Sequence, residues 1–248
     1  MQQQRRVIVT GASSGIGAAA VRMFRANGWA VLGVARRADR LAALAAETGC
    51  DVLVVDVTDG DSVAAMVEHL EQLGPVHALV NNAGGAFGQD SIESGDVDEW
   101  RRMYEVNVIG VKRVITAVLP LLRRAVAPRD SATIVNITSI AGHIAYEGGG
   151  GYNAAKFAAH ALTAVLRLEL AGEPIRVVEI APGMVKTDEF SLIRFAGDQA
   201  RADKVYENVP APLTAEDVAA EIVHACELAP HIDLDLVTIK PVAQAAPW

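Results

Sequence analysis

The chain has 248 residues, of which 51% are hydrophobic, and its formal net charge at pH 7 is −8. This length is sufficient for one large domain with a well-buried core, which we expect to span residues 1–248. The acidic balance argues against nucleic acid as a partner, because phosphate contacts require clustered cations.

Cysteine content and hydropathy exclude further classes of protein. Cys50 and Cys226 are the only cysteines, too few for a disulfide framework in a chain of this length. The apolar run Val7–Val9 leads directly into a glycine-rich loop, which indicates a first strand and not a signal peptide. No run is long and apolar enough to span a membrane. We therefore expect a soluble, cytoplasmic protein without a membrane partner.

Short β-branched runs alternate with longer, alanine-rich stretches of helical periodicity. In chain order we expect a strand at Val7–Thr10, a helix at Ile16–Asn27, a strand at Trp29–Ala35, a helix at Arg37–Thr48, a strand at Asp51–Val55, a helix at Asp61–Gln72, a strand at Ala78–Asn81, a helix at Val97–Leu122 with a break near Pro120, a strand at Ala132–Ile137, a helix at Tyr152–Ala171, a strand at Ile175–Ile180, a helix at Ala215–Leu228 and a strand at Asp235–Ile239. Strands that are apolar throughout and joined by helices predict a parallel sheet covered on both faces. The fold class is thus α/β, a single doubly wound, Rossmann-type sheet of about seven strands. The segment around 184–212 lacks clear periodicity, which predicts a functional loop over a binding site.

A glycine-rich loop connects the first strand to the first helix. Residues Thr10–Gly17 read TGASSGIG, with the spacing G-x-x-x-G-x-G. Glycines at this place allow a tight turn and let backbone N–H groups approach a pyrophosphate, and the helix N-terminus adds its positive partial charge. Because strand, loop and helix occur in the required order, the pattern predicts dinucleotide binding.

The end of the second expected strand indicates which dinucleotide is preferred. An acidic residue about 20 residues beyond the glycine loop would bond the ribose 2′-OH of NAD. This chain has Arg36-Arg37 there, and a guanidinium can bind a 2′-phosphate with paired hydrogen bonds. No carboxylate is expected at that strand end, because Asp39 already belongs to the following helix. The pattern favours NADP over NAD, with Ser14 as a further ligand of the phosphate; the alternative is that both arginines merely begin a solvated helix.

Tyr152 and Lys156 are spaced i, i+4, so they share one face of a helix. Alone, this spacing is common and usually structural. Here Ser139 follows an expected strand, Asn81–Gly84 ends another, and Asn107 lies between them. Strand carboxyl ends are where ligands bind in open α/β sheets.

Taken together, these motifs resemble the short-chain dehydrogenase/reductase family over essentially the whole chain. The residues that carry the resemblance are the Thr10–Gly17 loop, Asn81–Gly84, Asn107, Ser139, Tyr152, Lys156 and Pro182-Gly183. The segments Pro182–Val185, Glu189-Phe190 and Arg194–Asp198 are similar to the subgroup of NADP-dependent serine and 3-hydroxy acid dehydrogenases.

The resemblance implies a catalytic set of four residues. Tyr152 would be the general acid in reduction and the base in oxidation, Ser139 would hold the substrate oxygen, and Asn107 would anchor a water in a proton relay to Lys156. A free phenol has a pKa of about 10. One ammonium about 4 Å away supplies roughly the 4 kcal/mol needed to lower it by about three units. We therefore expect Lys156 to lower the pKa of Tyr152.

The resemblance also implies a set of cofactor-binding residues. They are Gly11, Ser13, Ser14, Gly15, Ile16, Gly17, Arg36, Arg37, Asp56, Val57, Asn82, Ala83, Gly84, Tyr152, Lys156, Pro182, Gly183, Val185 and Thr187. Asp56 would bond the adenine amine, and Val185 and Thr187 would meet the nicotinamide carboxamide; a simple loop hydroxyl is the alternative for Thr187.

Other side chains near these motifs have open roles. His143 and Tyr146 either border the substrate or are ordinary loop residues, and Arg194 either pairs with a substrate carboxylate or is exposed. The four glycines of Gly148–Gly151 predict a mobile loop before Tyr152. The remaining histidines show no metal-ligand spacing, so no metal site is expected; they are His69, His77, His160, His224 and His231.

These features predict an NADP(H)-dependent oxidoreductase that interconverts a secondary alcohol or 3-hydroxy acid with its carbonyl form. A non-catalytic NADP sensor or scaffold on the same fold is one alternative, although Tyr152 and Lys156 are both present. An epimerase or dehydratase is another, although such longer relatives carry an extra C-terminal substrate domain. The resemblance implies a homotetramer, or a dimer, formed through the helices Val97–Leu122 and Tyr152–Ala171; burial of their apolar faces within one chain is the alternative.

Overall fold

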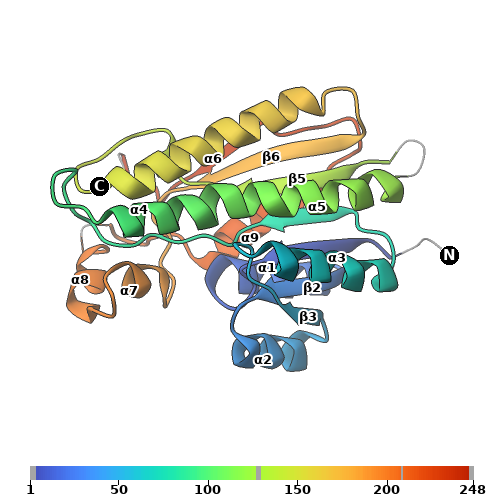
Figure 1. Cartoon of the computed structure of the whole chain (residues 1–248), viewed down its shortest axis with the longest axis horizontal. Coiled ribbons are helices and arrows are strands. Elements are labelled where there is room, and N and C mark those ends of the chain that lie inside the picture. The colour runs from blue at the N-terminus through green and yellow to red at the C-terminus, as the bar shows by residue number, and fades with distance from the viewer. Residues whose placement is uncertain (1–3, 127–129, 208, 246–248) are drawn as a thin grey trace.

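A seven-stranded parallel sheet forms the centre of the computed structural model, which describes residues 4–126, 130–207 and 209–245 (Figure 1). The strand order is β3-β2-β1-β4-β5-β6-β7, and neighbouring strands pair in parallel. The strands are β1 (Arg6–Thr10), β2 (Ala30–Ala35), β3 (Asp51–Val54), β4 (Ala78–Asn81), β5 (Ala132–Ile137), β6 (Ile175–Pro182) and β7 (Leu236–Ile239). The predicted doubly wound sheet is confirmed, with each strand end within two residues of its expected position.

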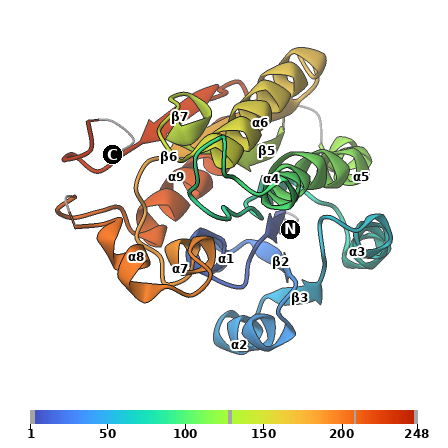
Figure 2. The same cartoon turned by 60° about the vertical axis from the view of Figure 1, so that its left-hand side comes forward.

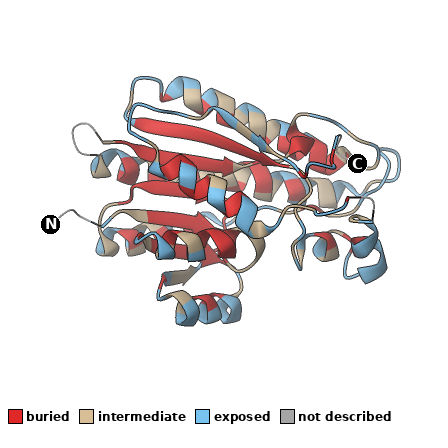
Figure 3. Ribbon diagram, turned by 180° about the vertical axis from the view of Figure 1, so that it is seen from behind, coloured by how far each residue is buried: buried red, intermediate tan, exposed pale blue. Residues whose placement is uncertain are grey.

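Helices cover both faces of the sheet, and alternating strand residues belong to different cores. Val7 and Val9 pack with α1, α2 and α9, whereas Ile8 packs with α3, α5 and α6. Because both faces are covered, the central strands are buried along their length, as Figure 3 shows in red. The main covering helices are α1 (Gly15–Ala26), α2 (Ala38–Thr48), α3 (Gly60–Leu73), α4 (Val97–Tyr104), α5 (Gly110–Ala125), α6 (Gly150–Glu169) and α9 (Ala215–Glu227). No helix among the described residues is long and apolar enough to cross a membrane.

The order of the strands places a crevice at the carboxyl end of the sheet. From β1 the chain runs outward through β2 and β3 and then returns to β4 on the other side of β1. The helices α1 and α5, which come after β1 and β4, therefore pack on opposite faces of the sheet, and a ligand site opens where the strand order reverses. Gly11 has a φ of +67°, and a Cβ on it would lie 2.8 Å from the Asn82 side chain. Glycine is thus required where the loop after β1 approaches the loop after β4.

The long helix expected at 97–122 is interrupted, but not near Pro120, which lies inside α5. The break is the π-helical turn Glu105–Ile109 between α4 and α5. In this turn the Asn107 side-chain amide donates to the carbonyl oxygen of Met103 at 2.8 Å. That carbonyl lies four residues before Asn107, so the side chain adds a hydrogen bond across the turn at the break.

Two of the four glycines that we expected in a loop before Tyr152 belong instead to a helix, where they allow close packing. Gly150 and Gly151 form the start of α6. A Cβ on Gly150 would lie 2.7 Å from Trp100, and one on Gly151 would lie 2.5 Å from Met103. Their lack of side chains lets α6 contact α4 directly.

The segment at 184–212 contains two short helices that the sequence did not predict. They are α7 (Phe190–Arg194) and α8 (Gln199–Lys204), which lie beside the carboxyl end of the sheet (Figure 2). Asp198 caps α8 by accepting the backbone N–H of Arg201. The segment therefore forms a wall of the crevice.

Candidate functional site

A cavity of about 1790 Å³ lies at the carboxyl ends of the strands. It extends from the glycine loop, past the ends of β2 and β3, to α7 and α8. The predicted site residues that line it are Gly11, Ser13, Ser14, Gly15, Ile16, Arg36, Arg37, Asp56, Val57, Asn82, Ala83, Gly84, Ser139, Tyr152, Lys156, Pro182, Gly183, Val185 and Thr187. Gly17 and Asn107 are the two predicted residues that do not line it. The structure thus brings nearly all of the predicted site to one cavity.

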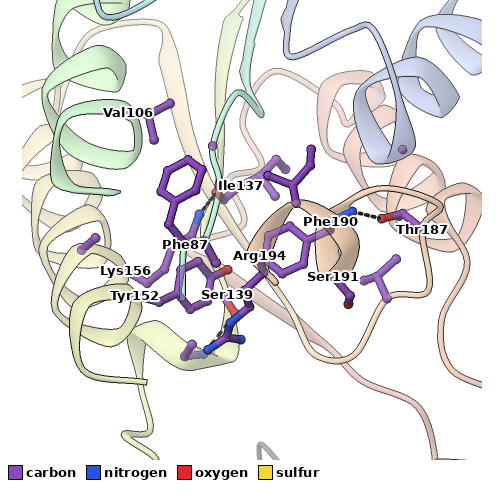
Figure 4. A pocket seen from close by; sticks show the side chains of 18 of the residues that line it. Phe87, Val106, Ile137, Ser139, Tyr152, Lys156, Thr187, Phe190, Ser191 and Arg194 are labelled. Atoms are coloured by element: carbon purple, nitrogen blue, oxygen red, sulfur yellow. Dashed lines mark hydrogen bonds between the residues drawn. The ribbon is translucent and has the colours of Figure 1, made fainter. Parts of the chain in front are cut away.

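Three polar side chains converge in the middle of this cavity (Figure 4). Tyr152 and Lys156 belong to α6, and Ser139 follows β5. The Lys156 Nζ atom donates to the carbonyl oxygen of Ile137 at 3.2 Å and lies 5.7 Å from the centre of the Tyr152 ring. Tyr152 is 8% exposed and Lys156 is 7% exposed, so a phenol and an amine lie together in a largely desolvated place.

Burial has the largest effect on the pKa values of Tyr152 and Lys156. It raises the pKa of the Tyr152 phenol; the nearby Tyr146 adds to the rise, and a hydrogen bond with Ser139 and the charge of Arg194 act in the opposite direction. Burial also lowers the pKa of Lys156 to about 8, opposed by the negative charge of Glu179. The expected lowering of the Tyr152 pKa by Lys156 is therefore wrong for this structure. Desolvation of the phenol outweighs the attraction of neighbouring charges.

Asn107 lies behind the cavity wall. Its Nδ2 atom donates to the carbonyl oxygens of Gly85 and Met103, both at 2.8 Å. A Cβ on Gly84 would lie 2.6 Å from Asn107 Oδ1 and 3.7 Å from Lys156 Nζ. Asn107 thus holds the loop after β4 close to the lysine.

The far end of the cavity fits the adenosine part of a dinucleotide. Gly17 has no room for a side chain, because a Cβ there would overlap the carbonyl oxygen of Gly11. The loop is therefore compact, with the start of α1 directed at the cavity. Arg36 is exposed at the end of β2. Asp56 accepts hydrogen bonds from the backbone and hydroxyl of Thr58; burial acts to raise the pKa of Asp56, but these bonds and nearby arginines lower it overall.

Arg37 has a partner that the sequence did not reveal. Its guanidinium donates to both carboxylate oxygens of Glu189 at 2.8 and 2.7 Å, and to the hydroxyls of Ser13 and Ser14 at 2.9 Å. The expectation that no carboxylate lies at the end of β2 is therefore wrong. Glu189 comes from the segment before α7, and no spacing pattern links it to Arg37.

The other end of the cavity surrounds Tyr152 with aromatic and cationic groups. The Arg194 guanidinium lies 5.7 Å from the centre of the Tyr152 ring, donates to the carbonyl oxygen of Gly88 and to the Tyr146 hydroxyl, and is shown with Tyr152 in Figure 4. The Phe190 ring packs edge-on against Tyr152, with ring centres 6.0 Å apart. Tyr146 lines the cavity, whereas His143 points to Glu179 and does not line it.

Replacement of Lys156 by Met should change how stability depends on pH. Lys156 has a pKa of about 8 in the folded chain against 10.5 ordinarily, so between these values the unfolded chain binds more protons. In the wild type this group makes the free energy of unfolding rise by up to about 3 kcal/mol as the pH rises through this window. For Lys156→Met, the free energy of unfolding measured in urea should not show this rise over the same pH window. Lys112→Met, at an exposed position on α5, is the control; equal slopes in wild type and Lys156→Met would contradict the prediction.

Comparison with known proteins shows to which family the chain belongs. The family model for short chain dehydrogenase matches residues 5–194. An uncharacterized oxidoreductase of Mycobacterium tuberculosis is 48% identical over 98% of this chain and 94% of its own length. A sulfoacetaldehyde reductase of Chromohalobacter salexigens is 39% identical, covering 96% of this chain and 94% of the relative. An NADP-dependent 3-hydroxy acid dehydrogenase of Salmonella typhi is 37% identical, covering 96% of each chain.

The fold comparison gives the same result. The closed form of serine dehydrogenase complexed with NADP+ superposes with a TM-score of 0.91 at 34% identity, covering 97% of this chain and 96% of that one. The resemblance to serine and 3-hydroxy acid dehydrogenases is thereby confirmed. The chain belongs to the short-chain dehydrogenase family and is an oxidoreductase of that family.

Proposed function

We propose that this oxidoreductase interconverts a secondary alcohol or 3-hydroxy acid and its carbonyl form, with NADP(H) as cofactor and Tyr152 as acid and base. The observation that carries the proposal is the convergence of Ser139, Tyr152 and Lys156 in the cavity that also contains the glycine loop. A non-catalytic sensor would need the loop but not these three side chains.

Tyr152 has the environment of a proton donor. Because burial raises its pKa, the phenol keeps its proton at neutral pH. In reduction the phenolic O–H bond breaks and the proton passes to the carbonyl oxygen, while the Ser139 hydroxyl hydrogen-bonds to that oxygen. NADPH supplies the hydride, and NADP+ accepts it in the reverse direction. Lys156 then stabilises the phenolate as a neighbouring cation until a proton returns to it.

The cofactor preference follows from the end of β2. Arg36 is exposed there and lines the cavity, so its guanidinium is accessible to a 2′-phosphate. Gly11, Gly15 and the start of α1 would hold the pyrophosphate. The serine dehydrogenase that superposes with this chain is complexed with NADP+, and the Salmonella relative is NADP-dependent by name.

The substrate class follows from Arg194, whose guanidinium lies beside Tyr152. A cation next to the proton donor favours a substrate with an anionic group close to its carbonyl carbon. Three relatives have names that denote such substrates: sulfoacetaldehyde carries a sulfonate, and serine and 3-hydroxy acids carry a carboxylate. The segment around 184–212, which contributes Arg194, would then be the substrate loop.

We also infer a homo-oligomer, a tetramer or a dimer, that functions in the cytoplasm. Phe157, Val165 and Leu168 form an exposed apolar stripe on α6, at 41%, 51% and 77% exposure. Exposed apolar stripes of this kind are typical of subunit contacts. Both cysteines are free, which agrees with a reducing compartment. Light scattering that gave the mass of one chain would contradict the oligomer.

Tyr152→Phe should abolish turnover and leave cofactor binding intact. The substitution removes only the hydroxyl that moves the proton, so we expect a loss of at least about 100-fold in kcat. NADPH binding, followed by its fluorescence, should be unchanged and tighter than that of NADH. Thr116→Val, which removes an exposed hydroxyl from α5 outside the cavity, is the control that should keep its activity. A variant that retained most turnover would overturn the assignment and favour the sensor.

Arg194→Gln should discriminate against anionic substrates. We expect KM for a 3-hydroxy acid or a sulfonated aldehyde to rise at least about tenfold, the value of one charge-assisted contact, while a neutral aldehyde changes little. Because Arg194 lowers the pKa of Tyr152, the variant should also oxidise alcohols optimally at a higher pH than the wild type. Equal losses on charged and neutral substrates would show that Arg194 has only a structural role.

A further inference from the structure

A second cluster of chemically reactive side chains lies outside the cavity, between α6 and β6. Glu179 on β6 is 1% exposed, and its carboxylate meets two imidazoles. His143 Nε2 lies 3.1 Å from Oε1, and His160 Nδ1 lies 2.8 Å from Oε2. The centres of the two imidazole rings are 4.3 Å apart. None of these three side chains lines the cavity.

We infer that His143, His160 and Glu179 form a binding site for a divalent cation of the zinc class. Their ligand atoms all lie within 4.8 Å of one another. A tetrahedral zinc ion with bonds of about 2.0–2.2 Å separates its ligand atoms by about 3.4 Å. The two N···O distances, 3.1 and 2.8 Å, would open by about 0.3 and 0.6 Å when the ion binds, through rotation of the side chains. Two imidazoles with one carboxylate is a ligand set that zinc uses in proteins.

The charge of the cluster also favours a cation. A buried carboxylate is costly unless a positive charge compensates it. The Glu179 carboxylate is shared by two imidazoles whose ring centres are 4.3 Å apart, so both nitrogens face the same charge. The Lys156 ammonium interacts with this carboxylate from a distance, but its hydrogen bond is directed to the Ile137 carbonyl oxygen. One divalent ion held by the two imidazoles would compensate the charge of Glu179 directly.

The surroundings supply the other requirements of a metal site. Thr138 Oγ1 donates to Glu179 Oε1 at 2.7 Å. This bond orients the carboxylate, in the way that hydrogen bonds from neighbouring groups orient the ligands of protein metal sites. In the part of the chain that the structure describes, the second nitrogen of each ring has no hydrogen-bond partner, so it can carry the proton while the first binds the ion. The side chains of His143 and His160 are 23% and 38% exposed, which leaves an entry path and a position for water.

The ligands come from three separate places in the chain. His143 ends the short 3-10 turn Ile140–Gly142, His160 lies one turn after Lys156 on α6, and Glu179 lies on β6. Figure 1 shows α6 lying along β6, which brings these places together. This separation explains why ligand spacing in the sequence gave no sign of a site, and the site does not depend on the proposed reaction.

Metal titration of the tag-free protein tests the site. We expect one equivalent of Zn(II) to bind by calorimetry, and Co(II) at the same place to give the strong visible absorption of a four-coordinate ion without a thiolate band. His143→Gln and His160→Gln should each weaken binding at least about tenfold, and Glu179→Gln should abolish it. His224→Gln, which removes an exposed histidine from α9, should bind as the wild type does.

Two results would overturn the inference. One is the absence of saturable binding by the wild type, and the other is binding that the cluster variants leave unchanged. Because both histidines are partly exposed, their variants should remain folded even if Glu179→Gln does not. Circular dichroism of each variant checks this, so loss of binding in a folded histidine variant supports the site.

Discussion

An ammonium group that leaves water loses several kcal/mol of hydration, and it is retained in a protein only where neighbouring groups compensate that loss. Lys156 is 7% exposed, and groups on two neighbouring strands compensate its charge. The Ile137 carbonyl oxygen at the end of β5 accepts a hydrogen bond from Lys156. The negative charge of Glu179 on β6 opposes the lowering of the Lys156 pKa. The loop after β4 approaches it only because position 84 is glycine. The geometry of the candidate site around Lys156 thus follows from how the fold accommodates one buried amine.

The π-helical turn between α4 and α5 also holds the loop that faces Lys156. Asn107 belongs to the π-helical turn, and its side chain bonds both to Met103 in the same helix and to Gly85 in the loop after β4. The turn therefore connects α4 and α5 to the strand end that faces Lys156.

Features of the fold that depend on local pattern could be predicted from the sequence. The β-branched runs gave all seven strands, and glycine spacing together with Tyr152 and Lys156 identified the cavity. Features that depend on residues distant in the sequence could not be predicted. The pairing of Arg37 with Glu189 joins positions that are 152 residues apart. The same limit applies to the glycines before Tyr152, because only the position of Trp100 shows that they are needed for packing.

The Arg37–Glu189 ion pair also connects the two ends of the cavity. Glu189 directly precedes α7, and α7 ends at Arg194 beside Tyr152. One short helix is therefore held near the glycine loop by an ion pair and presents the Arg194 guanidinium beside Tyr152. Arg37 and Glu189 are 39% and 20% exposed, and pairs of this exposure contribute about 1 kcal/mol or less. The pair thus positions α7 as part of the cavity wall, next to both the glycine loop and Tyr152.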